Sequence, residues 1–131
     1  MKNLATGIIF IVAASAFLGE KTLAGRWQYL GGIYNGKKDG PPADYTLQRR
    51  YDSSHYNAFA LQKGYKPERY EAGDYQIKGD TCIETETFSS QPSKLKDIPV
   101  RYLFSIRKDT LIFKGKLPSG MVVEEYWKRV K

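Results

Sequence analysis

The sequence predicts an all-β fold, an eight-stranded antiparallel up-and-down β-barrel. After the N-terminal segment, short runs of alternating apolar and polar residues recur between turn sequences, which is typical of barrel strands. No window there combines the apolar spacing and the capping residues of a helix. The connections are short, so neighbouring strands should pair antiparallel, and a sheet of eight strands tends to curl shut and lose its free edges. The 131 residues are enough for one such domain.

The chain begins with the features of an export signal. A short basic start precedes an uncharged apolar run over residues 4–17, and Ala14-Ser15-Ala16 fits the small-x-small cleavage pattern. We expect residues 1–16 to be the signal peptide, with a cut as late as Ala24 as a second option, and residues 25–131 to form the barrel. A membrane anchor is the alternative, but a spanning helix needs about 20 apolar residues and this run is shorter. The product is expected in the periplasm or outside the cell, without stable membrane insertion.

Turn residues delimit the first four predicted strands. A loop over residues 35–42, with two Gly and two Pro, follows the first strand. Asp52-Ser53-Ser54 separates the second strand from the third, and Gly64 and Pro67 interrupt the chain before the fourth. These four strands span residues 25–34, 44–51, 55–62 and 69–77.

The last four strands are bounded in the same way. Lys78-Gly79-Asp80 precedes the fifth strand, a loop over residues 89–96 precedes the sixth, and Arg107-Lys108-Asp109 precedes the seventh. The final hairpin turns through Pro118 and Gly120, because Pro presets φ and Gly accepts a positive φ. These four strands span residues 81–88, 98–106, 110–116 and 121–129.

Strand alternation predicts a barrel interior that is rich in aromatic residues. An eight-stranded barrel has room for packed side chains or for one small ligand. Tyr buries an apolar ring but needs a partner for its hydroxyl, so this lining suits an amphipathic ligand, with a solid tyrosine-rich core as the alternative. Alternation does not decide which face of the strand 81–88 points inward. The residues expected to meet a ligand inside the barrel are Tyr45, Arg49, Tyr51, His55, Phe59, Tyr75, Tyr102, Phe104, Phe113 and Glu125.

The two ends of the domain carry the two tryptophans and are expected to meet. Gly25-x-Trp27 on the first strand, with Arg129 at the end of the last, resembles the signature of the lipocalins and the wider calycins. The resemblance implies that Trp27 packs across the barrel floor against Arg129, where a guanidinium over an indole is attracted by the ring. Nearly all of the chain after the leader also resembles small exported bacterial lipocalin-like domains of unknown function, which implies a fold and no ligand. The residues expected to close the barrel are Gly25, Trp27, Trp127 and Arg129.

Candidate catalytic and metal-binding groups are few. His55 is the only histidine, and with Glu84 and Glu86 it would form an acid–base or metal site only if the strand 81–88 turned those carboxylates inward. No His-x-His, Cys-x-x-Cys or Gly-x-Ser-x-Gly motif supports such chemistry. Cys82 is the only cysteine, so no disulfide is expected and the thiol should be a small buried apolar group. The sequence therefore predicts neither an enzyme nor a cofactor or metal.

Charge leaves one alternative function open. The formal net charge is +7, with the basic residues scattered over turns and strand faces. An exported protein with a filled barrel would use such basic loops on an anionic polymer or a protein partner, whereas export argues against nucleic acid. The first hypothesis is an exported binding protein for a small, partly apolar or amphipathic ligand inside a tyrosine-rich barrel.

Overall fold

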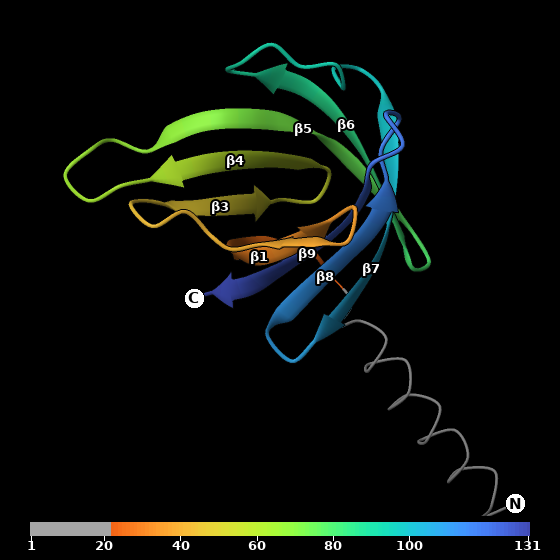
Figure 1. The fold of residues 1–131 in the computed structure, drawn as a ribbon, viewed down its shortest axis with the longest axis horizontal. Helices are drawn as coiled ribbons and strands as arrows, with labels where there is room; N and C mark the ends of the chain where they lie inside the picture. The colour runs from red at the N-terminus through yellow and green to blue at the C-terminus, as the bar shows by residue number, and fades with distance from the viewer. Residues whose placement is uncertain (1–21) are drawn as a thin grey trace, which may run out of the picture.

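The structure, a computed structural model that describes residues 22–131, is all-β, and its strands wrap into a barrel (Figure 1). The strand order is β2-β1-β3-β4-β5-β6-β7-β8-β9, and β1 also pairs with β9. Strands β1 and β3 to β9 thus form a closed antiparallel barrel of eight strands, which confirms the predicted fold class. The expected signal peptide, residues 1–16, lies outside the described residues. The strands are β1 (Gly25–Tyr34), β2 (Lys37–Asp39), β3 (Thr46–Tyr51), β4 (His55–Leu61), β5 (Glu68–Lys78), β6 (Thr81–Ser89), β7 (Pro99–Arg107), β8 (Thr110–Lys116) and β9 (Val122–Val130).

Strand β2 lies where the sequence predicted only a loop. It forms a hairpin with the end of β1 through Asn35 and Gly36, both of which have positive φ angles (50° and 81°). An Asn-Gly pair favours this tight turn, because both residues tolerate a left-handed backbone. The short hairpin belongs to the same sheet as the barrel and pairs with residues 32–34 at the end of β1.

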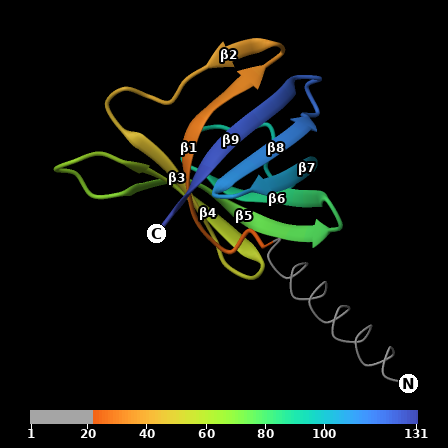
Figure 2. The same ribbon diagram turned by 90° about the horizontal axis from the view of Figure 1, so that it is seen from below.

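The seam between β1 and β9 closes the barrel, and Figure 2 shows β1, β9, β8 and β7 side by side. Trp27 pairs with Arg129 and Tyr29 with Trp127 across this seam. Trp27 is 0% exposed, and the Arg129 guanidinium lies 4.1 Å from the centre of its ring. Gly25, with a φ of 125°, makes room for this arrangement, since a Cβ there would lie 3.0 Å from the Arg129 guanidinium.

The two ends of the barrel differ. The end near Trp27 and Arg129, here called the floor, is covered by residues 22–24. The Leu23 side chain of this segment is buried in the aromatic core. The Trp27 indole donates to the Leu23 carbonyl (2.8 Å), and Arg129 donates to the carbonyls of Ala24 (3.2 Å) and Thr22 (3.5 Å). The opposite end, the mouth, carries the β2 hairpin and the loops over residues 62–67, 90–98 and 117–121.

The half of the barrel nearest the floor is a packed aromatic core. Tyr51 makes an edge-to-face contact with Tyr75 (ring centres 5.1 Å apart), and Tyr102 packs against Phe113 (5.5 Å). Rings arranged in this way stabilise a core beyond the area they bury. The solid, tyrosine-rich core that was expected as the alternative is thus found in the half of the barrel nearest the floor. The buried core residues are Leu23, Trp27, Tyr29, Tyr51, Tyr56, Tyr75, Cys82, Phe104, Leu111, Phe113 and Trp127.

Candidate functional site

A cavity of about 430 Å³ occupies the mouth half of the barrel. Cavities of this size hold small organic ligands. Its deep wall is polar and aromatic, and apolar side chains from the strands and mouth loops surround its outer part. The deep residues are Tyr29, Arg49, Tyr70, Glu71, Glu84, Tyr102, Glu125 and Trp127, and those nearer the mouth are Tyr34, Asp39, Gly40, Pro42, Leu47, Leu95, Leu117, Met121 and Val123.

Arg49 on β3 lies at the bottom of the cavity, between two carboxylates. Its guanidinium lies 3.0 Å from a carboxylate oxygen of Glu84 and 3.5 Å from one of Glu71. The group is 9% exposed and also stacks over the ring of Tyr56, 4.4 Å from its centre. Its Nε–H has no partner within the described chain. A buried cation is tolerated here because two anions and an aromatic face replace its water.

Three tyrosine–glutamate hydrogen bonds fix the carboxylates. Tyr51 donates to Glu84 (2.6 Å), Tyr56 to Glu71 (2.6 Å) and Tyr34 to Glu125 (2.7 Å). Tyr29 and Tyr34 share a further hydrogen bond of 2.5 Å, and the Trp127 indole reaches the second oxygen of Glu125 (3.3 Å). These three carboxylates are therefore held in fixed positions, because each accepts from a rigid aromatic donor.

The tyrosines that hold the carboxylates are held in their neutral form. Burial is the largest cause that raises the pKa of Tyr51 and Tyr56, and the adjacent carboxylates raise it further. Burial also raises the pKa of Tyr70 to about 12. For Arg49, burial acts to lower the pKa, but the charges of Glu84 and its neighbours outweigh it and raise the pKa above the usual value. The site therefore combines neutral phenols, one permanent cation and several carboxyl groups.

The predicted ligand residues divide into groups. Arg49, Tyr102 and Glu125 line the cavity. Tyr51, Tyr75, Phe104 and Phe113 point inward but belong to the packed half nearest the floor. Tyr45 lies outside the barrel at the mouth, 42% exposed.

His55 and Phe59 were expected inside the barrel, and the structure places both on the outer face. The His55 side chain is 61% exposed and lies beside Asp74 (3.3 Å), while Phe59 packs under the guanidinium of Arg50 (4.3 Å). Residues 56, 58 and 60 of β4 point inward instead. Both faces of this strand carry apolar residues, and the turn sets the register: the Asp52 carboxylate accepts the backbone N–H groups of Ser54 (2.9 Å) and His55 (2.7 Å).

The face of β6 that alternation left open is now decided. Cys82, Glu84 and Glu86 are buried and point inward. His55, on the outer face, does not share a site with these carboxylates. Among the described residues, no three His, Cys, Asp or Glu side chains are arranged to hold a metal ion.

Sequence reasoning missed Tyr34, Tyr70 and Glu71. Glu71 has the same parity as Gly73 and Tyr75, so the alternation of β5 contained its signal. Tyr34 and Tyr70 face the cavity because of β-bulges. The bulge in β1 lies between Tyr29 and Gly31 and turns Tyr34 inward. The bulge in β5 lies opposite Ala58 and Phe59 and leaves Tyr70 unpaired. A bulge inserts one residue and inverts the alternation beyond it. Gly32 then clears the space for Tyr34, since a Cβ there would lie 2.8 Å from the Tyr34 hydroxyl.

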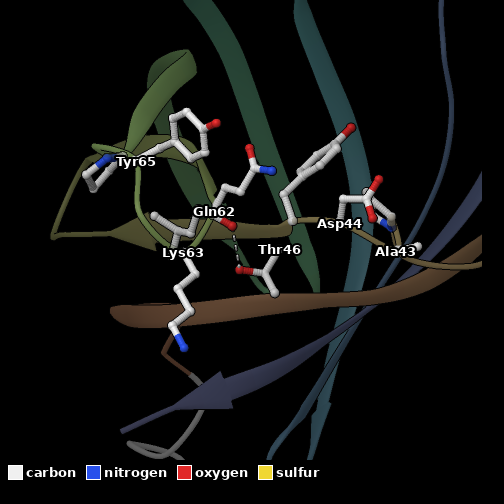
Figure 3. Close-up of a pocket in the computed structure, with 10 residues that line it drawn as sticks. Ala43, Asp44, Thr46, Gln62, Lys63 and Tyr65 are labelled. Carbon is white, nitrogen blue, oxygen red and sulfur yellow. Dashed lines mark hydrogen bonds between the residues drawn. The ribbon is translucent and has the colours of Figure 1, made fainter.

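A second, more open hollow of about 520 Å³ lies on the outside of the mouth (Figure 3). It is formed where residues 42–46 run beside residues 61–67, and Thr46 donates a long hydrogen bond to the Leu61 carbonyl (3.5 Å). Tyr65 stands at its edge, 72% exposed. This hollow lacks the buried charges of the interior cavity, so the interior cavity is the stronger candidate site.

The barrel is similar to a solved lipocalin-like protein from Bacteroides uniformis. The two structures align with a TM-score of 0.58 over 82% of this chain and 98% of that chain, with 15% sequence identity. The fold is lipocalin-like. At this identity the likeness of the two lipocalin-like barrels concerns the fold alone. No family model matches the sequence, and no curated protein matches it. Within residues 22–131, no helix has the length and apolar character needed to span a membrane.

Proposed function

We propose that this protein is an exported carrier or sensor that binds one small, partly apolar molecule in the mouth half of its lipocalin-like barrel. One observation carries the proposal: the cavity of about 430 Å³ above the packed floor. A barrel of eight strands that served only as a scaffold would have enough side-chain volume to fill this space. The cavity instead has a polar bottom and an apolar surround, which suits an amphipathic ligand.

Binding is proposed rather than catalysis. Arg49, the one cation among the described residues that line the cavity, is already engaged by Glu84 and Glu71. The Cys82 thiol is buried below, and burial raises its pKa, so it is a poor nucleophile. Export is proposed from residues 1–16 and is tested by the mass of the chain recovered from the periplasm of an expressing bacterium.

The test of ligand binding uses two neighbouring valines of β9. Val123 is buried against the cavity, whereas Val122 is 54% exposed on the outside. We expect a panel of fluorescent alkyl and heterocyclic probes to include at least one that binds saturably, with one site per chain. Val123→Trp should fill the cavity and weaken that binding at least tenfold, while Val122→Trp should leave it unchanged.

Met121→Trp, at the edge of the same cavity, provides a second blocking variant if Val123→Trp does not fold. Circular dichroism and thermal melting check the fold of each variant. The absence of saturable binding by every probe would overturn the proposal. So would saturable binding that a folded Val123→Trp or Met121→Trp leaves intact.

A second candidate function rests on the charge of the mouth. Exposed lysines on β2 and on two mouth loops make this end basic: Lys37, Lys38, Lys63, Lys66, Lys94 and Lys96. An anionic polymer or surface would be attracted to this rim, and the attraction would weaken with salt. In this case Lys37→Glu with Lys38→Glu should weaken binding to dextran sulfate, and Lys78→Glu with Lys128→Glu at the floor should not.

A further inference from the structure

The cavity is acidic, although the protein as a whole is basic. The chain has a formal net charge of +7. Among the described residues that line the cavity, Arg49 faces four carboxylates, those of Asp39, Glu71, Glu84 and Glu125. The composition of the chain alone would favour the opposite sign. The acidic interior is therefore a feature of this site.

Arg49 does not make the cavity a site for anions. Its guanidinium lies within 3.5 Å of both Glu71 and Glu84, so its charge is already balanced. Bringing a ligand carboxylate beside these two groups would add a third anion in a region of low dielectric, where like charges repel strongly. Within residues 22–131, Glu125 then remains without a cation, since its two oxygens accept from Tyr34 and the Trp127 indole.

Glu86 provides an independent observation that points the same way. It follows Glu84 on the inward face of β6, closer to the mouth, and is 8% exposed. One of its carboxylate oxygens has no hydrogen-bond partner in the described part of the chain. A buried carboxylate oxygen that lacks a donor is destabilising. Glu86 does not line the cavity itself, so it adds to the acidic character of the barrel interior and is not a contact of the ligand.

The remaining lining fits a cation with an apolar tail. The hydroxyls of Tyr70 and Tyr102 make no hydrogen bond to described residues, and their rings, with that of Trp127, offer the aromatic faces that attract organic cations. Leu95, Leu117 and other apolar side chains surround the outer part. A ligand would therefore enter with its charged head first and leave its apolar portion near the loops.

We propose that the cavity selects an amphipathic organic cation, such as an alkyl or aryl amine, with its charged nitrogen between Glu71 and Glu125. This inference rests on the proposed binding function and names the ligand class. It excludes fatty acids as the preferred occupants. The selection comes from the fixed carboxylates, which need no rearrangement to receive an ammonium group.

The test compares three probes with the same tail: octylamine, n-octanol and octanoate. Isothermal titration calorimetry gives their affinities, and a change in intrinsic tryptophan fluorescence reports occupancy, because Trp127 lines the cavity and Trp27 does not. We expect octylamine to bind at least tenfold more tightly than n-octanol, and octanoate to bind most weakly. Glu125→Gln and Glu71→Gln should each weaken octylamine about tenfold and leave n-octanol unchanged.

Glu124→Gln is the matched control, because it removes the same charge from the next residue of β9. Glu124 pairs with Lys114 (3.8 Å) instead of lining the cavity, so its loss should not affect octylamine. Glu71→Gln is the second variant if Glu125→Gln does not fold. Octanol or octanoate binding as tightly as octylamine would overturn this inference and leave the proposed function standing. Failure of octylamine to bind while a probe of the fluorescent panel binds saturably would also overturn this inference alone, whereas the proposed function is overturned only if that whole panel fails.

Discussion

Arg49 is the residue on which the polar interior depends. It joins Glu84, Glu71 and the ring of Tyr56, and it separates the packed half of the barrel from the hollow half. A buried ion pair is weak support for overall stability, but removing one partner leaves the other charge uncompensated. The effect of leaving Glu84 without its cation can therefore be measured as a change in the free energy of unfolding.

Arg49→Met should lower the free energy of unfolding by about 3–5 kcal/mol, because Glu84 would remain buried without its cation. Arg50→Met is the matched control on the adjacent, outer position, where the guanidinium covers Phe59 and donates to Gln48 (2.7 Å), and it should cost no more than about 1–2 kcal/mol. Denaturant unfolding measures both. Combining Arg49→Met with Glu84→Gln should restore part of the loss. Equal losses for the two single variants would contradict this account of the interior.

Cys82 should be chemically silent in the folded protein. Its side chain is 0% exposed, and burial is the largest cause that raises its pKa above the usual value. Thiolate formation is thus suppressed, and reagents have no access. A thiol-reactive dye should label the native protein only at the rate of unfolding and label the denatured chain at once. Rapid labelling without loss of the circular dichroism signal would contradict the buried placement.

At the scale of the elements, residues 22–24 act as part of the barrel floor. Leu23 fills the space beneath Trp27, and the carbonyls of this segment accept hydrogen bonds from Trp27 and Arg129. A signal-peptide cut after Ala24 would remove all of these contacts.

A chain that begins at Gly25 should be less stable than one that begins at Thr22 by at least about 2 kcal/mol. The loss combines the burial of Leu23 with the hydrogen bond that the buried Trp27 indole would lack. Thermal and urea unfolding of the two chains give the difference. Equal stabilities would show that the segment contributes little to the floor.

The stability of the whole molecule depends on many tyrosines whose phenol groups stay protonated. Seven of its ten tyrosines have pKa values raised above 10, with burial as the largest cause in each. The unfolded chain loses its phenolic protons near pH 10, before the folded protein does. The stability that these groups contribute is thus fully present below pH 10 and decreases as the pH rises through their folded values.

Stability should therefore be nearly constant up to about pH 9 and fall steeply above pH 10. Tyr51 and Tyr56, which are 4% and 1% exposed, each contribute up to about 1.4 kcal/mol per pH unit in that range. Tyrosinate absorbance followed together with far-ultraviolet circular dichroism provides the measurement. Most of the absorbance change should coincide with unfolding. A complete tyrosinate transition in a protein that keeps its β signal would contradict the buried network.

The local pattern of the chain determined the closed barrel, the positions of eight strands and the seam between β1 and β9. It succeeded because a period of two, turn residues and end-to-end closure are properties of neighbouring residues and of strand number. It also placed Arg49, Tyr102 and Glu125 on inward faces, since the alternation of β3, β7 and β9 runs unbroken through these positions.

Tertiary structure decided where the cavity lies and which charges it holds. The turn at Asp52 set the register of β4 and turned His55 outward, and bulges in β1 and β5 brought Tyr34 and Tyr70 inward. Neither event is visible in residue alternation, because a shift of one residue reverses every side chain beyond it. Likewise, pairing between distant strands brought Glu71, Glu84 and Arg49 together. Their common burial follows from closure of the barrel and from no single stretch of sequence.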